Sequence, residues 1–566
     1  MKTKPTISVT DSFLSTIVVK TIFSSIILVF TLLLFISCKN DAPKSEITLT
    51  TTKAKEKVHV AFAGGGWRAH TGHSAWTVSL LDNGSNKLKD VFSNVGTISS
   101  NSGGSWFSTM LMFSDSFVSD IEAENAVNTW TTTSGWIGKQ RKHFDAAPCD
   151  YVPEGVYLEC VFDHYTNTYI TGGTYWKLMV EKLVYKDYPL GLNTLSSARR
   201  PWAVGKSLLL ASTLLKNTVV LNKVDWELYH RYYQACIDPI YPTLNGDSGS
   251  GCGSGYQIDV TPVTFSSLPK DSSFIPSPFL AELGVTGNSS SLHLGYTKDF
   301  YDTAPKDTAT INLPLINDNV PIMTAASASS AALGFAASER ITGVFGLSYT
   351  FSEDAVSFGL ANSKVQYVDA TGLKLQELAS KKVVRLADGG ALDNSGIIQL
   401  VRSLQLNDQE KDFNIIAFDN ITSLYNGENA ETYVGVDIAS LFGYPNKLCF
   451  DIKITKYCIN LPSVQIFEKQ TLSKSDTIWT HGTNGGNQLI YTKYKIKTKE
   501  NTTMGVTEGT NGTLHVFTCV YPNAVTAPID GDTNFDAYEA MFKFINSGLN
   551  NKKGEGLKHL QTALGF

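Results

Sequence analysis

The stretch VHVAFAGGGWRA occupies residues 58–69, and the stretch SSNSGGSW occupies residues 99–106. The first is a short apolar run, typical of a buried strand, that leads into three glycines and then into helical spacing up to Leu81. The second follows a strand predicted over residues 92–98 and places Ser102 at the start of another helical segment. Strand, glycine loop, helix, strand, tight turn and helix in this order predict the opening of a parallel α/β sheet.

Alternation of strands and helices returns late in the chain. Residues 382–387 form a predicted strand that runs into Asp388, residues 397–404 a helix, and residues 414–419 another buried strand. Between the two alternating regions the pattern loosens, and we expect residues 115–325 to form a cap inserted over the site.

The composition favours a folded globular protein. The 566 residues carry a formal net charge of −5, and 42% of them are hydrophobic and 17% charged. Such a chain is too apolar to remain disordered. Its charge gives no electrostatic reason to expect nucleic acid as a partner.

The N-terminus has the layout of an export signal, with basic residues before an almost uncharged run that ends at Cys38. The segment LLFISC, residues 33–38, resembles a bacterial lipobox. It implies a signal peptide over residues 1–37, acylation of Cys38 and a tether over residues 38–57. The alternative is an uncleaved anchor helix. In both cases we expect residues 58–566 to be the catalytic domain, held at the cell envelope and facing the periplasm or the cell surface.

The remaining cysteines fall into three closely spaced pairs and one remainder. None of the pairs has the CxxC spacing of a zinc site, so the sequence indicates short disulfide loops. The remainder is expected to be a buried thiol. The pairs are Cys149/Cys160, Cys236/Cys252 and Cys449/Cys458, and the remainder is Cys519.

Ser102 and the three glycines supply two halves of a serine acyl-transfer site. A serine hydroxyl is a poor nucleophile until a base takes its proton and N–H donors stabilise the oxyanion. A sharp turn puts Ser102 at a helix N-terminus, whose dipole favours the developing charge. Gly64, Gly65 and Gly66 leave their N–H groups unobstructed and form the predicted oxyanion hole. The alternatives are a Ser/Gly loop without chemistry and a nucleotide phosphate loop, whose GxxxxGK[ST] and GxGxxG spacings are missing.

Asp388 and Arg68 complete the predicted site. Asp388 follows a strand at the edge where α/β sheets form their sites, and loss of water there strengthens a carboxylate as a base. Asp393 and Asp419 are competing carboxylates, although Asp393 fits a capping turn of the next helix. Arg68 is placed to bind a phosphodiester head group, with a structural salt bridge as the alternative.

His70 and His73 are the obvious rival bases, and a His-x-x-His pair can be half of a metal site. The sequence shows no third metal ligand at a recognisable spacing from this pair, and His-x-x-His is common on a solvated helix face. The sequence therefore predicts no metal and no cofactor.

Residues 64–74, GGGWRAHTGHS, resemble the GGGxRAxxGxxG segment of cytosolic phospholipase A2 and its lysophospholipase relatives. The turn at Ser102 and the Asp-Gly-Gly sequence at Asp388 resemble motifs that these enzymes share with patatin, and the Ser/Ala segment 325–332 resembles the one before their aspartate strand. The resemblance implies a three-layer α/β/α fold with a mostly parallel sheet and an inserted cap.

The resemblance also implies a serine–aspartate dyad without histidine. Ser102 would be the nucleophile and Asp388 its base, with Gly65 and Gly66 as oxyanion donors and Arg68 near the phosphate.

Two positions depart from the family pattern, because Ser100 replaces a glycine and Gly104 replaces a serine or threonine. Both departures bear on the level of activity. We expect a membrane-tethered lipid acyl hydrolase of the phospholipase A2/lysophospholipase type, with a phospholipid or lysophospholipid as substrate. The alternatives are acyl transfer by the same site, and a surface lipoprotein that binds lipid or glycan on an inactive hydrolase fold.

Overall fold

The computed structural model describes the predicted catalytic domain with gaps. The predicted signal peptide, Cys38, the tether up to residue 56 and the pair Cys236/Cys252 lie outside the described residues. The described residues are 57–82, 84–132, 134–149, 160–161, 164, 179–194, 197–215, 260–267, 292–294, 310–312, 321–330, 353–354, 366–368, 374–375, 385–405, 411–427, 430–445, 447–452, 455–460, 464–483, 486–501, 504–528 and 531–566.

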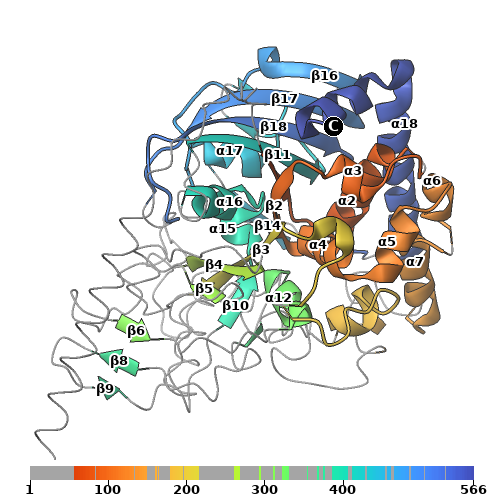
Figure 1. Cartoon of the computed structure of the whole chain (residues 1–566), viewed down its shortest axis with the longest axis horizontal. Helices are drawn as coiled ribbons and strands as arrows, with labels where there is room; N and C mark the ends of the chain where they lie inside the picture. The colour runs from red at the N-terminus through yellow and green to blue at the C-terminus, as the bar shows by residue number, and fades with distance from the viewer. Residues whose placement is uncertain are drawn as a thin grey trace, which may run out of the picture. The chain divides into compact units, whose positions relative to one another are not determined.

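An 11-stranded sheet forms the centre of this domain (Figure 1). Neighbouring strands run parallel in the order β18-β11-β1-β2-β3, and antiparallel strands extend both sides. The parallel strands are β1 Val58–Phe62, β2 Val95–Asn101, β3 Ser207–Leu215, β11 Asp412–Ile421 and β18 Asn511–Val520. The antiparallel strands are β16 Thr477–Gly482 and β17 Gln488–Lys497 beyond β18, and β4 Val260–Ser267, β5 Leu292–Leu294, β7 Glu353–Asp354 and β10 Arg385–Asp388 on the side of β3.

Short strands pair outside the main sheet. They are β12 Asn426–Gly427 with β13 Ala430–Glu431, β14 Lys447–Ile452 with β15 Thr455–Asn460, and β8 Gln366–Val368 between β6 Thr310–Asn312 and β9 Lys374–Leu375.

Helices cover both faces of the sheet, with α2, α4–α7 and the long C-terminal α18 on one side and α16 and α17 on the other (Figure 1). The helices are α2 Gly66–Leu80, α3 Leu88–Val91, α4 Ser102–Phe113, α5 Asp115–Ile121, α6 Ala126–Thr129, α7 Trp136–Ala146, α12 Ile322–Ser329, α15 Gly390–Asp393, α16 Ile397–Ser403, α17 Val436–Leu441 and α18 Gly531–Leu564. Short turns of other helix types are η1 Val180–Val184, η2 Pro201–Ala203 and η7 Lys474–Asp476.

Successive residues of the parallel strands point into different helix layers. Phe62 and Phe418 belong to the core that includes α2 and α4, whereas Ala61 and Ala417 belong to the core that includes α16 and α17. This period of two is what a sheet buried on both faces requires. The structure therefore confirms the predicted three-layer α/β/α fold, with a parallel centre and antiparallel sides.

Described parts of residues 115–325 belong to the body of the domain and not to the predicted cap. Residues 207–215 are β3, a central strand of the sheet, and α5–α7 bury Phe117, Trp130 and Trp136 in the main core. The run SLLLASTLL suits a buried strand, but its sheet neighbours are distant in the chain, and spacing does not reveal them. Residues 216–259 and 268–291, which the prediction also assigns to the cap, lie outside the described residues.

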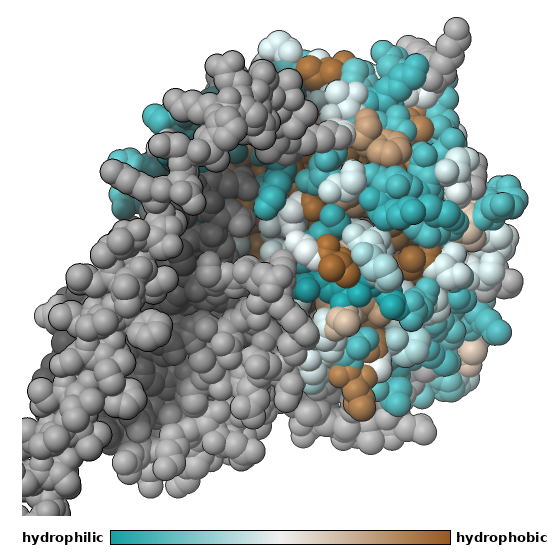
Figure 2. Space-filling model, viewed as in Figure 1, coloured by the Kyte–Doolittle hydropathy of each residue, from teal (hydrophilic) through white to brown (hydrophobic). Residues whose placement is uncertain are grey.

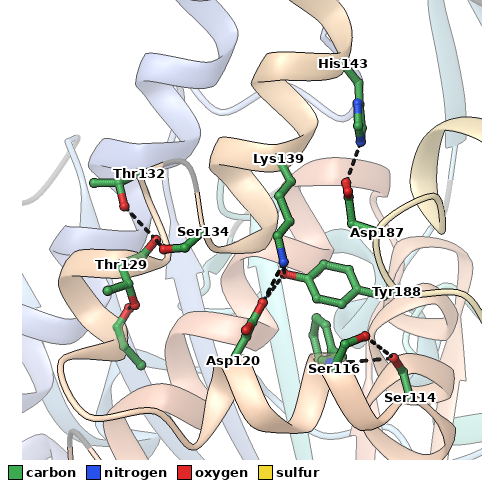
Figure 3. A network of polar contacts seen from close by, with 12 residues as sticks. Ser114, Ser116, Asp120, Thr129, Thr132, Ser134, Lys139, His143, Asp187 and Tyr188 are labelled. Atoms are coloured by element: carbon green, nitrogen blue, oxygen red, sulfur yellow. Dashed lines mark hydrogen bonds and ion pairs between the residues drawn. The ribbon is translucent and has the colours of Figure 1, made fainter.

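Polar contacts tie the segment after η1 to α5 and α7 (Figure 3). Lys139 Nζ donates to Asp120 Oδ2 at 2.8 Å and to the Tyr188 hydroxyl at 3.0 Å, and Tyr188 donates to the same carboxylate at 2.7 Å. His143 Nε2 lies 2.5 Å from Asp187 Oδ2. Residues in this part of the predicted cap thus belong to the body of the domain.

The cysteines partly match the prediction. Cys149 and Cys160 form a disulfide, and Cys519 is a buried free thiol, as predicted. Cys449 and Cys458 lie directly opposite each other in the β14–β15 hairpin, and their disulfide stays a prediction.

Among the described residues, no helix is both long and apolar enough to cross a bilayer. On the face drawn in Figure 2, hydrophobic residues are scattered among polar ones and do not gather into one patch. Among the residues that the structure describes, the most exposed large hydrophobic side chain is Leu192, at 99%.

We predict that Phe107→Ala lowers the free energy of unfolding by about 3–5 kcal/mol, because it empties a fully buried site. The Phe107 ring lies 5.0 Å from Phe62 and 5.7 Å from His73, centroid to centroid, and is 0% exposed. Urea denaturation measures the change, and Leu192→Ala is the control, expected to stay within about 0.5 kcal/mol of the parent. Similar losses for both variants would contradict the assignment of this core.

Candidate active site

Ser102 stands at a sharp turn between β2 and α4. Its φ is +49°, a left-handed conformation that costs a non-glycine residue energy. Close packing behind the turn explains the two glycines that follow. A methyl group on Gly103 would lie 2.0 Å from the Gly66 carbonyl oxygen, and one on Gly104 would lie 2.4 Å from that of Phe62. The structure thus forms the sharp strand–helix turn predicted at Ser102.

Ser100, which replaces the usual glycine, is accommodated beneath the turn. Its hydroxyl lies 2.7 Å from the Ser108 hydroxyl and accepts a bond from Ser105 at 3.4 Å. Ser105 in turn lies 2.7 Å from the hydroxyl of Ser329 in α12, which accepts the Ser102 backbone N–H at 3.3 Å. Hydrogen bonds therefore satisfy the extra hydroxyl, and the turn keeps its shape.

The pairing of β3 brings Asp388 to Ser102. β3 pairs with β4 over residues 208–215 on one edge, so β2 and β10 share its other edge. β2 ends with Asn101 opposite Ala211, and β10 ends with Asp388 opposite Ser212. The two strands run toward each other and end at consecutive positions of β3. Asp388 follows a strand, as the sequence predicts, but this strand runs antiparallel to β3, which the sequence does not predict.

Asp388 is buried and surrounded by hydrogen-bond donors. The Oδ1 of Asp388 accepts hydrogen bonds from the Gly390 N–H at 2.7 Å and from the Asn101 Nδ2 at 3.1 Å. The Ser102 hydroxyl lies near this carboxylate and lowers its pKa. Burial raises the pKa of Asp388 to about 6, against the lowering effect of these donors. A carboxylate of this pKa is charged at neutral pH and is a stronger base than a solvated one.

The glycine loop lies against Ser102, where a methyl group on Gly64 would come within 2.9 Å of the Ser102 Cβ. Gly65 and Gly66 have φ values of +124° and +55°. Neither of their N–H groups has a hydrogen-bond partner within the described part of the chain. Gly64 differs from the prediction, because its N–H donates to the Asn394 carbonyl at 2.8 Å. Only Gly65 and Gly66 thus keep the free donors that an oxyanion hole requires.

Arg68 is engaged by the protein itself. Its Nε donates to the Asn420 carbonyl at 2.9 Å and its Nη1 to that of Ala524 at 3.4 Å. Burial lowers the pKa of Arg68, and the fields of Tyr538, Asp419 and other neighbours oppose that shift. These contacts give Arg68 a structural role through backbone carbonyls, and the described residues show no salt bridge of the predicted kind. A phosphate contact through its Nη2, which lies beside Gly65, stays a prediction.

The two competing aspartates have other surroundings. Asp393 accepts the Ser395 hydroxyl at 2.9 Å and the Gln399 N–H at 3.1 Å, which confirms the predicted capping turn before α16. Burial raises the pKa of Asp419 to about 7, while the positive charge of Arg68 lowers it. Neither carboxylate has Ser102 among its hydrogen-bond partners.

The two histidines of α2 are buried, so the expectation of a solvated helix face is wrong. His73 Nε2 lies 2.7 Å from the Ala63 carbonyl oxygen, and His70 stacks on Trp136 at 3.8 Å between ring centroids. Burial lowers the pKa of His73 to about 4 and that of His70 further below its ordinary value. The described residues contain no cluster of three His, Cys, Asp or Glu side chains that could hold a metal ion.

Sequence reasoning missed Asn101, Asn394 and Asp437. Asn101 Nδ2 donates to Asn394 Oδ1 at 3.1 Å, and Asn394 Nδ2 donates to Asp437 Oδ2 at 2.6 Å. The position of Asn101 directly before Ser102 is the one signal of this network in the sequence.

No protein-family model and no curated protein matches this chain. Among solved structures it is similar to human GIVD cytosolic phospholipase A2, with 12% sequence identity and a TM-score of 0.37. The match covers 90% of this chain and 63% of that one. A likeness at this level carries no argument about activity, so the function is argued from the geometry of the site.

We predict that Ser102→Gly is more stable to urea than Ser102→Ala by about 1 kcal/mol, because glycine adopts a φ of +49° without steric cost. Both variants lack the hydroxyl, so their difference reports the backbone alone. At Ser108, inside α4, the order of the same two substitutions should reverse. Equal stability of the two Ser102 variants would contradict a left-handed nucleophile turn.

Proposed function

We propose that this chain is a carboxylic ester hydrolase that acts on acyl lipids through Ser102 and Asp388. One observation carries the proposal. A serine in left-handed conformation at a strand–helix turn has its hydroxyl beside a buried carboxylate from a distant strand, which ends at the next position of β3. A structural serine needs neither the strained backbone nor the buried base.

The chemistry follows from these positions. Asp388 takes the hydroxyl proton as Ser102 Oγ attacks the ester carbonyl, and the N–H groups of Gly65 and Gly66 stabilise the oxyanion. The alcohol then leaves with the proton from Asp388, and the acyl group stays on Ser102. Water attacks this acyl-enzyme and gives a proton to Asp388. Asp388 then returns the proton to Ser102 Oγ as the bond to the acyl group breaks and the carboxylic acid leaves. His70 and His73 are committed to the core and do not take part in this scheme.

The lipid specificity rests on the sequence. The motif resemblance supports a phospholipid or lysophospholipid substrate of the phospholipase A2/lysophospholipase type. A lipid anchor at Cys38 would hold the site at the membrane that supplies such a substrate. The phospholipid or lysophospholipid substrate and the anchor at Cys38 are therefore part of the proposal. Metabolic labelling with a radioactive fatty acid tests the anchor, because Cys38→Ala should no longer incorporate the label.

We predict that Ser102→Ala and Asp388→Asn each lower kcat on a chromogenic acyl ester by about 10³-fold or more, because each removes one partner of the proton transfer. Release of fatty acid from phosphatidylcholine and lysophosphatidylcholine vesicles should fall in parallel. Ser74→Ala, a buried serine of α2 whose hydroxyl donates to the His70 carbonyl, is the control and should keep its turnover. A wild-type chain that binds these vesicles without turnover would support the inactive binding protein instead.

A further inference from the structure

Asn101 occupies the cap position of α4 without capping it. Asparagine is a favoured N-cap because its side chain accepts a backbone N–H of the first turn. Here Asn101 has the extended backbone of a cap residue, with φ −140° and ψ 151°, but its side chain makes no cap hydrogen bond. The side chain serves another purpose.

Both amide N–H donors of Asn101 are directed at acceptors from the loop after β10. Nδ2 lies 3.1 Å from Asp388 Oδ1 and 3.1 Å from Asn394 Oδ1. The orientation of this amide follows from the chemistry of the chain of contacts. This chain of contacts has the Asp388 carboxylate at one end and the Asp437 carboxylate at the other. A carboxylate only accepts hydrogen bonds, so the amides of Asn101 and Asn394 must each turn a nitrogen toward it.

We propose that Asn101 is a positioning residue that orients the Asp388 carboxylate toward Ser102 and keeps it charged. The inference rests on the proposed function and extends it to a third residue of the site. Asn101 and the Gly390 N–H both bind Oδ1, so the carboxylate is held in one orientation beside the Ser102 hydroxyl. Since Asn101 is covalently joined to Ser102, the base and the nucleophile are fixed to the same turn.

The packing around Asn101 leaves little room for another arrangement. A methyl group on Gly389 would lie 2.4 Å from Asn101 Oδ1, and one on Gly390 would lie 3.2 Å from its Nδ2. The Gly-Gly sequence after Asp388 therefore lets the loop close over this amide.

The charge balance at Asp388 predicts the effect of losing the amide. Burial raises the pKa of Asp388, and the field of Asp437, the charged side chain that acts on it, raises it further. The nearby Ser102 hydroxyl and the hydrogen bonds from Gly390 and Asn101 lower it. Without the Asn101 donor the pKa of Asp388 must rise, so the base becomes protonated at a higher pH and is lost from the active form sooner as pH falls.

The test is the rate of labelling by a fluorophosphonate probe between pH 4 and pH 9. The wild-type rate should fall below about pH 6, the pKa of Asp388. In Asn101→Ala the labelling rate should begin to fall at a pH about one unit higher than in the wild type. Above this pH, the labelling rates of the variant and of the wild type should become similar. In the nearly isosteric Asn101→Asp the rate should begin to fall at a still higher pH, because two adjacent carboxylates oppose each other's ionisation. Ser74→Ala, whose hydroxyl donates to the His70 carbonyl, is the control, and its labelling rate should fall at the same pH as in the wild type.

The pH profiles distinguish failure of the role of Asn101 from failure of the proposed function. If both Asn101 variants are labelled more slowly by the same factor at all pH values, and their rates begin to fall at the wild-type pH, Asn101 only supports the fold, and this inference alone is overturned. A wild-type chain that the probe does not label at any pH would overturn the proposed function as well. Should Asn101→Ala fail to fold by circular dichroism, Asn101→Asp, which keeps the volume of the side chain, decides by itself.

Discussion

The single edge of β3 shared by β2 and β10 is the constraint on which the site depends. Two strands that run toward each other must end where they meet, and their last residues, Asn101 and Asp388, face consecutive positions of β3. The chain leaves β2 through Ser102 and leaves β10 through two glycines. Two residues 286 positions apart in sequence (388 − 102) are thereby brought close together, a hydroxyl beside a buried carboxylate.

The left-handed backbone of Ser102 and the buried charge of Asp388 are both unfavourable, and contacts with the surrounding fold stabilise them. The left-handed backbone of Ser102 is maintained because Gly103 and Gly104 pack directly on the carbonyls of the β1 end and the glycine loop. The buried charge of Asp388 is tolerated because Gly390 and Asn101 donate to it and the Ser102 hydroxyl lies beside it. Strain at a nucleophile and a raised pKa at its neighbour are typical of catalytic sites, where they contribute to reactivity.

The sequence predicts the local parts of this structure better than the distant ones. The strand–glycine–helix and strand–serine–helix units are confirmed at β1–α2 and β2–α4, because each depends on neighbours in the chain. The insertion of β3 between β2 and β4, the antiparallel direction of β10, and the use of the Gly64 N–H by Asn394 were not predicted. Each of these is a contact between distant segments that residue spacing does not encode.

The most direct test of the central claim is to map the residue that a fluorophosphonate modifies, by peptide mass spectrometry, in the wild type and in Asp388→Asn. The account predicts one phosphonyl group, on Ser102, in the wild type, and labelling slowed by at least about 10³-fold in Asp388→Asn. A label on another serine, or equal rates in the two proteins, would contradict it.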